Sequence, residues 1–265
     1  MLALLAQLAP AGESPTVDAR RAAELIRRYP EAEVAVFPEL FLGGYRLEDA
    51  KTVACDPRGE EIAGIAAACA EARTAAVVGF TERSLGDLYD SLACIDADGE
   101  LAAVYRKAQL FGREAEVFRA GSHLEVIELA GRQVAPLVCF DVEFPELARS
   151  AALAGADLLV TCAANMEPYG REHRLHAAAR ALENRVPHLY VNRIGSEAGM
   201  RFVGESRAID ADGLVIREAG DGEEILLAEV GPAGAADSLV DYLHFEPTRM
   251  PVEVRSKSHS KGGTR

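Results

Sequence analysis

The sequence has few cysteines, a deficit of positive charge and no long apolar run. Its five cysteines, Cys55, Cys69, Cys94, Cys139 and Cys162, are odd in number, scattered and without a CxxC spacing. That pattern argues against a disulfide framework and predicts reduced thiols. Lysine and arginine total 28 against 42 aspartates and glutamates, a formal net charge of −14. Because such a surface repels phosphate backbones and anionic headgroups, we expect no nucleic-acid partner and no membrane partner.

Long apolar segments are also missing, although apolar residues are plentiful. No uncharged run reaches the length of about 18 residues that spans a membrane. The apolar start MLALLAQLAP lacks a basic segment and is too short for the core of a secretory signal. We therefore expect a cytoplasmic protein. Hydrophobic residues make up 49% of the 265 residues, enough to fill a globular core.

The sequence predicts one domain followed by a short tail. No linker rich in proline or serine interrupts the first 250 residues, so we expect a single domain over residues 1–250. Residues 251–265 are polar, basic and rich in glycine, and we expect this tail to be flexible or docked on a partner subunit.

Apolar runs rich in β-branched residues alternate with helical patterns, which predicts an α/β architecture. The expected strands are Leu2–Leu8, Glu33–Phe37, Ala75–Phe80, Ser91–Ile95, Ala102–Tyr105, Gln133–Val138, Leu158–Cys162, His188–Asn192, Gly204–Ile209 and Ile225–Glu229. One helix begins after Ser14, an N-cap residue, and ends before Pro30. The other expected helices cover Glu60–Ala72, Pro145–Ala154 and Arg171–Asn184.

Two short peptides each occur twice, in the same order. Phe-Pro-Glu-Leu stands at 37–40 and 144–147, and Ile-Asp-Ala-Asp-Gly stands at 95–99 and 209–213. An Asp-Gly pair between apolar strands is typical of a hairpin, because glycine takes the positive φ of a tight turn. The repeats predict two related halves, with convergent turn chemistry as the alternative.

Cys139 differs from the other thiols in its surroundings. The apolar strand Gln133–Val138 runs directly into it, and a polar turn and a helix opening at Pro145 follow. This arrangement is typical of a nucleophile elbow, where backbone N–H groups lower the thiol pKa and bind a developing oxyanion. A buried structural cysteine is the alternative.

Glu39 and Lys107 supply the other groups that thiol chemistry needs. Glu39 is a lone carboxylate among apolar residues at a strand end, where burial is expected to raise its pKa toward neutrality and suit it to proton transfer. Its alternative role is to bind loop N–H groups. Lys107 follows another strand, where basic residues usually form a solvated edge, but beside Glu39 and Cys139 it would stabilise an oxyanion. Together the three residues predict acyl transfer through a thioester.

The segments FPE around Glu39, YRK around Lys107 and CFDVEFPE from Cys139 resemble those of the nitrilase, or carbon–nitrogen hydrolase, superfamily over roughly residues 2–230. The resemblance implies that these three residues are catalytic. It also implies a four-layer α-β-β-α sandwich with internal pseudo-twofold symmetry, pairing into homodimers or higher homo-oligomers, and no metal or organic cofactor.

The resemblance further implies a second glutamate after the lysine. Spacing ahead of Phe118 and Gly121 favours Glu114, with Glu116 as the alternative. Family members often carry histidine two residues after the lysine, where this chain has Gln109.

Around Cys139 and at 164–169 the chain looks most like aliphatic amidases of the 5-aminopentanamidase and R-stereoselective types, which implies auxiliary or substrate-binding positions at Tyr45, Phe140 and Asn165. Nitrilases typically carry tryptophan and glutamate directly after the cysteine, whereas this chain has Phe140 and Asp141. We hypothesise that Glu143 binds a cationic amino group of the substrate. Its alternative role is a carboxylate favoured by a helix N-terminus.

The sequence therefore predicts a cysteine-dependent hydrolase that converts a small aliphatic, or ω-amino, carboxamide to its acid and ammonia. The first alternative is a nitrilase or N-carbamoyl amidohydrolase of the same superfamily. A thiol redox protein, with Cys139 oxidised and Cys162 as resolving partner, leaves Glu39 and Lys107 unexplained. His173 and His176 lie three residues apart with no third ligand nearby, so no metal site is expected.

Overall fold

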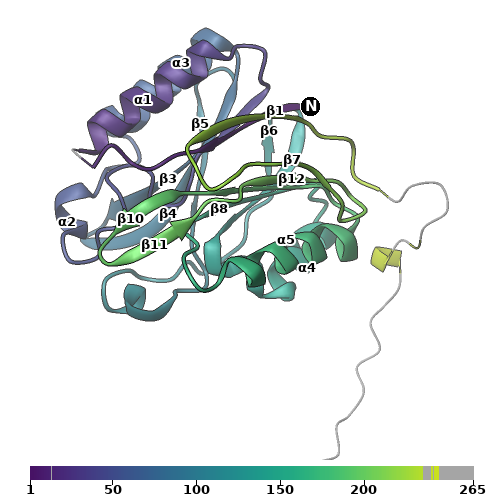
Figure 1. The fold of residues 1–265 in the computed structure, drawn as a ribbon. Coiled ribbons are helices and arrows are strands. Elements are labelled where there is room, and N and C mark those ends of the chain that lie inside the picture. Colours follow the sequence, from purple (N-terminus) through teal and green to yellow (C-terminus); the bar gives the residue numbers. More distant parts are fainter. Residues whose placement is uncertain (13, 235–239, 241, 245–265) are drawn as a thin grey trace, which may run out of the picture.

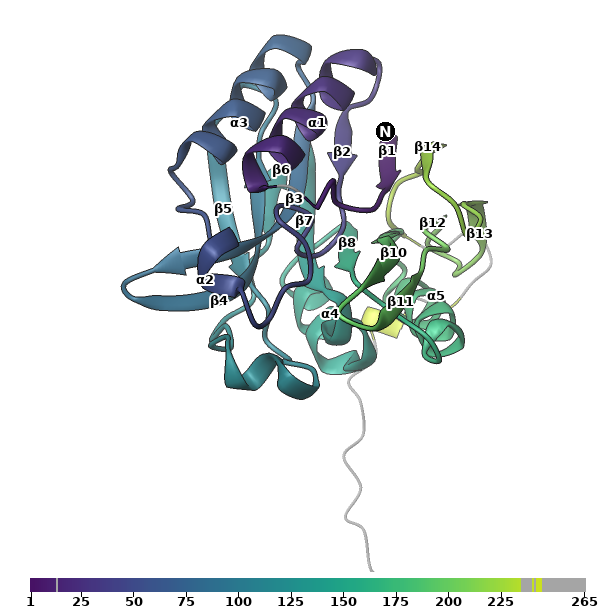
Figure 2. The same cartoon turned by 60° about the vertical axis from the view of Figure 1, so that its left-hand side comes forward.

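The protein is described by a computed structural model over residues 1–12, 14–234, 240 and 242–244. Two six-stranded sheets face each other, and each carries a pair of helices on its outer side (Figures 1 and 2). From one side to the other the layers are α1 with α3, the first sheet, the second sheet, and α4 with α5. The predicted four-layer α-β-β-α sandwich is confirmed.

The first sheet has the order β14-β1-β2-β3-β4-β5. Its strands are β1 (Leu2–Gln7), β2 (Val34–Val36), β3 (Ala75–Ser84), β4 (Asp87–Ile95), β5 (Leu101–Arg106) and β14 (Glu224–Glu229). Strands β1, β2 and β3 are parallel, and β4 and β5 continue as antiparallel hairpins. The connecting helices are α1 (Pro15–Arg28), the single turn α2 (Ala50–Val53) and α3 (Glu60–Ala72).

The second sheet has the order β13-β12-β9-β8-β7-β6. Its strands are β6 (Ile127–Leu129), β7 (Arg132–Val138), β8 (Leu158–Ala163), β9 (His188–Asn192), β12 (Arg207–Ile209) and β13 (Val215–Glu218). Its helices are α4 (Pro145–Leu153) and α5 (Gly170–Asn184), while β10 (Ile194–Glu197) and β11 (Met200–Val203) form a separate hairpin. The short 3-10 helices are η1 (Gly112–Glu116), η2 (Cys139–Glu143) and η3 (Tyr242–His244).

The two halves share one topology. In each half three parallel strands, β1-β2-β3 or β7-β8-β9, are joined by helices and followed by two antiparallel strands, β4-β5 or β12-β13. The repeated Ile-Asp-Ala-Asp-Gly peptides form equivalent hairpins, and each has a register shift immediately before its isoleucine. The predicted pseudo-twofold symmetry is therefore visible in the strand order.

The glycines of these hairpins explain why the peptide is repeated. Gly99 and Gly213 have φ of 85° and 78°. A Cβ on Gly99 would lie 2.7 Å from Ala66 O of α3, and one on Gly213 would lie 3.0 Å from Ala178 O of α5. Each hairpin thus packs closely on the helix of its own half, and only glycine fits both the turn and the contact.

The second repeated peptide does not belong to this symmetry. Phe37-Pro38-Glu39-Leu40 follows β2, the second strand of its half, whereas Phe144-Pro145-Glu146-Leu147 follows η2 after β7, the first strand of the other half. The interpretation of both peptides as marks of an internal repeat is wrong for this pair.

All ten expected strands occur, and the expected helices differ only at their ends. The strands that were not predicted are β6, β10, β11 and β13, which are three or four residues long. Short strands lack a clear apolar period, and β13 is exposed along its whole length. Strands β2, β8 and β9 were recognisable because they are fully buried and rich in apolar and β-branched residues.

Within the described residues, none of the helices is both long and apolar enough to cross a membrane. The tail predicted to be flexible or docked on a partner subunit, residues 251–265, lies outside the described residues. The single domain over residues 1–250 stays a prediction.

Candidate active site

Glu39, Lys107 and Cys139 meet at the ends of three strands. Glu39 lies three residues after β2, Lys107 directly follows β5, and Cys139 directly follows β7. Glu39 and Lys107 have no exposed surface, and Cys139 is 8% exposed. In α/β sheets the carboxyl ends of parallel strands are the usual place for a ligand site. The fold brings together the three residues that the family resemblance implies.

Lys107 lies among three buried carboxyl groups. Its Nζ is 2.5 Å from Glu39 Oε1, 2.8 Å from Glu114 Oε2 and 3.4 Å from Asp90 Oδ2. Burial by itself disfavours the charged amine, but the three carboxyl groups outweigh it and hold the Lys107 pKa well above its usual value. The site therefore contains a permanent positive charge.

The charge state of Glu39 differs from the expectation. Burial acts to raise its pKa, but Lys107, Asp90 and Cys139 together act more strongly in the other direction, and the pKa is lowered. The predicted rise toward neutrality is wrong, because a lone buried carboxylate was assumed and the real one has a cationic neighbour. Glu39 is ionised at neutral pH and ready to accept a proton.

Cys139 also departs from the expectation. Burial and the charge of Glu39 raise the pKa of its thiol well above the ordinary value, although Lys107 and the backbone N–H of Ala164 act to lower it. The resting pair is thus a thiol beside a carboxylate. A nucleophilic role for this sulfur would require its proton to leave, and the ionised Glu39 beside it can accept that proton.

Cys139 sits on a strained turn. Its φ is 42°, in the left-handed region that non-glycine residues rarely occupy. Asp141 stabilises the turn by accepting hydrogen bonds from Val138 N at 2.9 Å, Tyr105 Oη at 2.9 Å and Gln109 N at 2.8 Å. One buried carboxyl, whose pKa burial raises to about 6, thereby ties the elbow to the loop that follows Lys107.

The structure distinguishes the two candidates for a second glutamate. Glu114 is buried and accepts hydrogen bonds from Lys107 Nζ, from Tyr45 Oη at 2.5 Å and from Phe111 N at 2.7 Å. Glu116 is exposed and pairs with Arg113. Only Glu114 belongs to the buried cluster. The auxiliary residue Tyr45 joins it, and burial raises its pKa, so its hydroxyl stays a donor.

Among the described residues, one cluster of carboxyl groups is spaced closely enough to hold a metal ion. Oxygen atoms of Glu39, Asp90 and Glu114 lie within 4.8 Å of one another. Lys107 Nζ, however, lies within 3.4 Å of all three residues and already supplies a positive charge there. The donor set fits an ammonium group rather than a metal ion.

Cys139 and Glu114 line a narrow cleft with about 300 Å³ of empty space, its open mouth included. Its walls are largely aromatic. Phe111 contacts Phe140 and Tyr169 edge to face, with ring centroids 5.3 and 5.7 Å apart. Such a cleft favours a small ligand with an apolar body.

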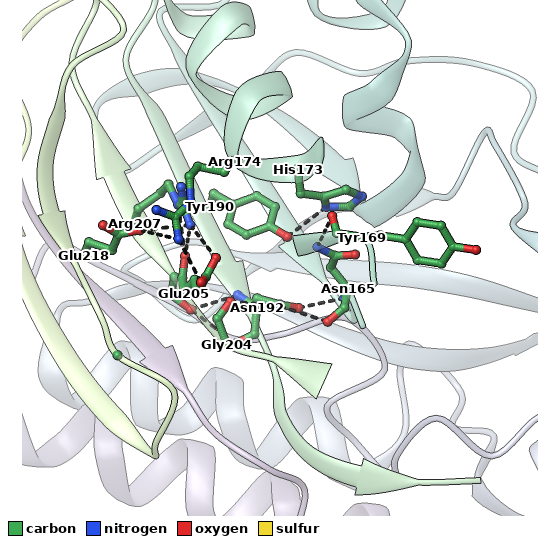
Figure 3. Close-up of polar contacts among 12 residues, drawn as sticks. Asn165, Tyr169, His173, Arg174, Tyr190, Asn192, Gly204, Glu205, Arg207 and Glu218 are labelled. Atoms are coloured by element: carbon green, nitrogen blue, oxygen red, sulfur yellow. Dashed lines mark hydrogen bonds and ion pairs between the residues drawn. The ribbon is translucent and has the colours of Figure 1, made fainter. Parts of the chain in front are cut away.

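Asn165 lines the same cleft at the end of β8, and its backbone is held on both sides (Figure 3). Asn165 N donates to Asn192 Oδ1 at 2.8 Å, and Asn192 Nδ2 donates to Asn165 O at 3.1 Å. The Asn165 side chain donates to Tyr169 O at 3.2 Å. These bonds fix the position of one polar group in a mostly apolar wall.

Glu143 is a half-buried carboxylate at the cleft. Its Oε1 is 3.3 Å from His173 Nε2, and His173 Nδ1 is 2.8 Å from Tyr190 Oη (Figure 3). Burial raises the pKa of Tyr190, so this hydroxyl can donate to Nδ1 and leave Nε2 to donate to Glu143. His173 lowers the Glu143 pKa. The His173 ring, held by Tyr190, thus orients the Glu143 carboxylate at the cleft.

Sequence reasoning missed two residues of the site, Asp90 and Gly79, and the turn-stabilising role of Asp141. A Cβ on Gly79 of β3 would lie 2.3 Å from Pro38 O and 2.6 Å from Leu40 N. Glycine therefore lets the loop carrying Glu39 pack directly on β3. The available signal was a glycine inside the apolar run 75–80, which marks a close backbone approach.

Comparison with known proteins agrees with this geometry. The sequence profile of the family described as carbon-nitrogen hydrolase matches residues 5–237. A protein of Pseudomonas protegens described as "Hydrolase in pqqF 5'region" is 39% identical over 202 residues, 74% of this chain and 71% of that protein. An (R)-stereoselective amidase of a Pseudomonas species is 31% identical over 234 residues, 88% of this chain and 85% of that protein. An amidase from Nesterenkonia sp. has a structure that matches with a TM-score of 0.81 at 28% identity over 92% of both chains.

The fold and the site together define a hydrolase built as an α-β-β-α sandwich around a buried cysteine. This chain belongs to the carbon–nitrogen hydrolase family, within the nitrilase superfamily. The predicted fold, superfamily and enzyme class, an amidase, are confirmed.

Proposed function

We propose that the protein hydrolyses a small aliphatic carboxamide to its carboxylic acid and ammonia through a thioester on Cys139. The observation that carries the proposal is the buried cluster in which Lys107 Nζ lies 2.5 Å from Glu39 Oε1 and the Cys139 thiol lies beside Glu39. This set contains a nucleophile, a base and a fixed charge for the oxyanion.

In the first half of the reaction Glu39 takes the proton of Cys139, and the sulfur attacks the amide carbonyl. Lys107 and the backbone N–H of Phe140 stabilise the oxyanion. The tetrahedral intermediate collapses as Glu39 returns the proton to the leaving nitrogen, which departs as ammonia. Glu114 holds Lys107 in place, and Tyr45 in turn donates a hydrogen bond to Glu114.

In the second half Glu39 takes a proton from water, and the resulting nucleophile attacks the thioester carbonyl. Collapse of the second tetrahedral intermediate expels the sulfur, which recovers the proton from Glu39. The acid leaves and the resting thiol and carboxylate are restored.

The size of the cleft and the relatives support a small amide. The aromatic cleft at Cys139 is narrow, with about 300 Å³ of empty space when its open mouth is included. Structures of the Nesterenkonia sp. AN1 amidase include a complex with butyramide and adducts of acrylamide and of the acetamide moiety of fluoroacetamide at its active site cysteine. All of these ligands of variants of that amidase are short amides, and we propose short amides as substrates of the present chain.

Ammonia release across a panel of amides tests the proposed function. Short aliphatic and ω-amino amides should be turned over, and matched nitriles and N-carbamoyl compounds should react at least tenfold more slowly, a difference of about 1.4 kcal/mol in the barrier. Faster turnover of the nitrile or the N-carbamoyl compound would contradict the amidase proposal and indicate a nitrilase or an N-carbamoyl amidohydrolase instead.

The redox alternative has little support. Peroxide reacts with accessible thiolates of low pKa. Cys139 and its suggested resolving partner Cys162 are both buried, and burial raises the pKa of both thiols.

Glu143 is the residue we propose to bind the amino group of ω-amino amides. Glu143→Gln should raise the KM for these amides about fivefold, as expected for a partly exposed ion pair worth about 1 kcal/mol, and leave kcat and the KM of neutral amides unchanged. Steady-state kinetics on chain-length-matched pairs measure this selectivity. Glu146→Gln, the same change on the exposed start of α4, is the control. An equal rise in KM for neutral amides would show that Glu143 has only a structural role.

We further propose that two copies pair through the outer helices. Leu175 and Leu182 lie seven residues apart on α5 and are 59% and 42% exposed, and Leu153 at the end of α4 is 65% exposed. Leu175→Glu should shift a dimer to a monomer in sedimentation experiments. Leu85→Glu, at a fully exposed leucine of the β3–β4 turn, is the control. Equal sedimentation of Leu175→Glu and the unmodified protein would exclude this face.

A further inference from the structure

We propose that Asp90 is a positioning residue for the general base: it carries a proton and donates a hydrogen bond to Glu39. The inference rests on the proposed function, because it assigns Glu39 the role of base. Its physical core, a buried neutral carboxyl group beside an ionised one, is measurable without any substrate.

Asp90 is part of the buried cluster through its strand. It lies on β4, has no exposed surface, and its backbone carbonyl accepts a hydrogen bond from Lys107 N at 2.9 Å. Its side chain reaches the same space as those of Glu39 and Glu114, with oxygen atoms of the three residues within 4.8 Å of one another.

The charges of this cluster come closer to balance when one carboxyl is neutral. Three carboxylates and one ammonium would leave two uncompensated negative charges without contact with water. Uncompensated charge in a protein interior is costly, and close carboxyl groups relieve it by sharing a proton. One bound proton removes half of the excess.

The hydrogen bonds indicate which carboxyl holds that proton. Glu114 accepts from Lys107, Tyr45 and Phe111, and Glu39 accepts from Lys107 at 2.5 Å. With every carboxyl ionised, both oxygens of Asp90 and Oε2 of Glu39 are buried without a hydrogen-bond partner. If Asp90 carries a proton, its carboxyl O–H can donate a hydrogen bond to Glu39 Oε2. Both groups then have a hydrogen-bond partner.

The electrostatic surroundings agree with this assignment. Burial and the charge of Glu39 raise the Asp90 pKa well above its ordinary value, and Lys107 at 3.4 Å opposes them without prevailing. Among the other groups packed around it, Glu114 adds negative charge and Cys162 on β8 is a protonated thiol. Glu82 on β3 is bonded to Arg106 and Ser91.

The bond has a consequence for catalysis. A donor on Oε2 helps to hold the Glu39 pKa below its usual value and restrains the carboxylate in one orientation toward Cys139. Removing the donor should raise the Glu39 pKa, so that protonation disables the base at higher pH.

Two substitutions distinguish the hypothesis that Asp90 is a neutral hydrogen-bond donor from the hypothesis that it acts through a negative charge. Asp90→Asn keeps the shape and a donor without any charge, and should retain at least about one third of kcat/KM with the acid limb of the pH profile in place. Asp90→Ala removes the donor and should move that limb upward by about one pH unit. Asp141, whose pKa burial raises to about 6, is present in every variant, so only a difference in the acid limb between variants is assigned to Glu39. Asp87→Asn, the same change at the outer end of β4, where Asp87 pairs with Arg119, is the control.

Asp90→Asn with the low activity and shifted limb of Asp90→Ala would overturn the proposal, because a required negative charge would then be the explanation. Thermal unfolding identifies a variant that fails to fold. If Asp90→Ala fails to fold, the comparison of Asp90→Asn with the unmodified enzyme still tests whether Asp90 acts as a neutral donor or as an anion.

Infrared spectroscopy tests the proton directly. About two pH units above the Asp141 pKa, where ordinary carboxyl groups are ionised, the unmodified protein should show the C=O stretch of one protonated carboxyl, absent from Asp90→Asn and present in Asp87→Asn. Absence of this band from the unmodified protein, or its persistence in Asp90→Asn, would overturn the assignment. Because the band needs no turnover, it can be present even if the proposed amidase reaction fails, and the two failures are distinguishable.

Discussion

Replacing Cys139 with alanine is expected to reduce amide hydrolysis by roughly 10⁴-fold or more, since removal of a catalytic nucleophile leaves only binding and oxyanion contacts. The proposed mechanism has no substitute for the sulfur. Glu39 and Lys107 are bound to each other at 2.5 Å, and neither is free to attack a carbonyl. Ammonia release measures the loss, and mass spectrometry of the unmodified enzyme quenched during turnover should detect an acyl group on Cys139.

Cys162→Ala is the matched control for this prediction. Cys162 is a fully buried thiol on β8, paired with Val138, the residue that precedes Cys139. Its loss should reduce stability by the usual amount for a small buried side chain, about 1 kcal/mol, and leave kcat largely unchanged. Appreciable turnover by Cys139→Ala, or an acyl group on another residue, would refute the thioester mechanism.

Replacing Glu39 with glutamine should lower amide turnover by about 10²- to 10⁴-fold, the usual contribution of a general base. Glutamine keeps the size of the side chain but cannot accept the thiol proton. The same substitution should make Cys139 more acidic, because the charge of Glu39 raises the thiol pKa and Lys107, which lowers it, remains. Turnover and thiol acidity should therefore change in opposite senses.

The pH dependence of alkylation by iodoacetamide measures the second effect. A thiolate forms as pH rises through the thiol pKa, so a lowered pKa moves the onset of alkylation to lower pH in Glu39→Gln. In the unmodified enzyme amide turnover should fall as the pH drops through the Glu39 pKa, which lies below its ordinary value. Glu116→Gln on the exposed side of η1 is the control. Undiminished turnover by Glu39→Gln, or a later onset of alkylation, would contradict the assigned roles.

Helices and strands were predicted correctly where the residues that cause them are close together in the sequence. Helix α1 begins at a Ser-Pro pair whose serine side chain accepts from Val17 N, and the hairpins after β4 and β12 follow from Asp-Gly turns. The buried strands β8 and β9 are visible as apolar runs. Strand β13 pairs with β12 at the edge of its sheet, and its residues are all exposed, so no buried apolar face marks it in the sequence.

The chain composition and its motifs determined the class of this protein: an α/β hydrolase with a cysteine, a lysine and a glutamate at strand ends. The class could be predicted because strands, turns and motifs depend on residues that are neighbours in the sequence. Only the tertiary structure decided the protonation states. Lys107 meets carboxyl groups that come from β4, η1 and the loop after β2, and their summed charges, rather than burial alone, lower the Glu39 pKa and raise that of Cys139. It also placed Glu114, and not Glu116, beside Lys107 and brought Asp90 into the same cluster. A pKa depends on distances between charges, and the order of residues along the chain does not contain these distances.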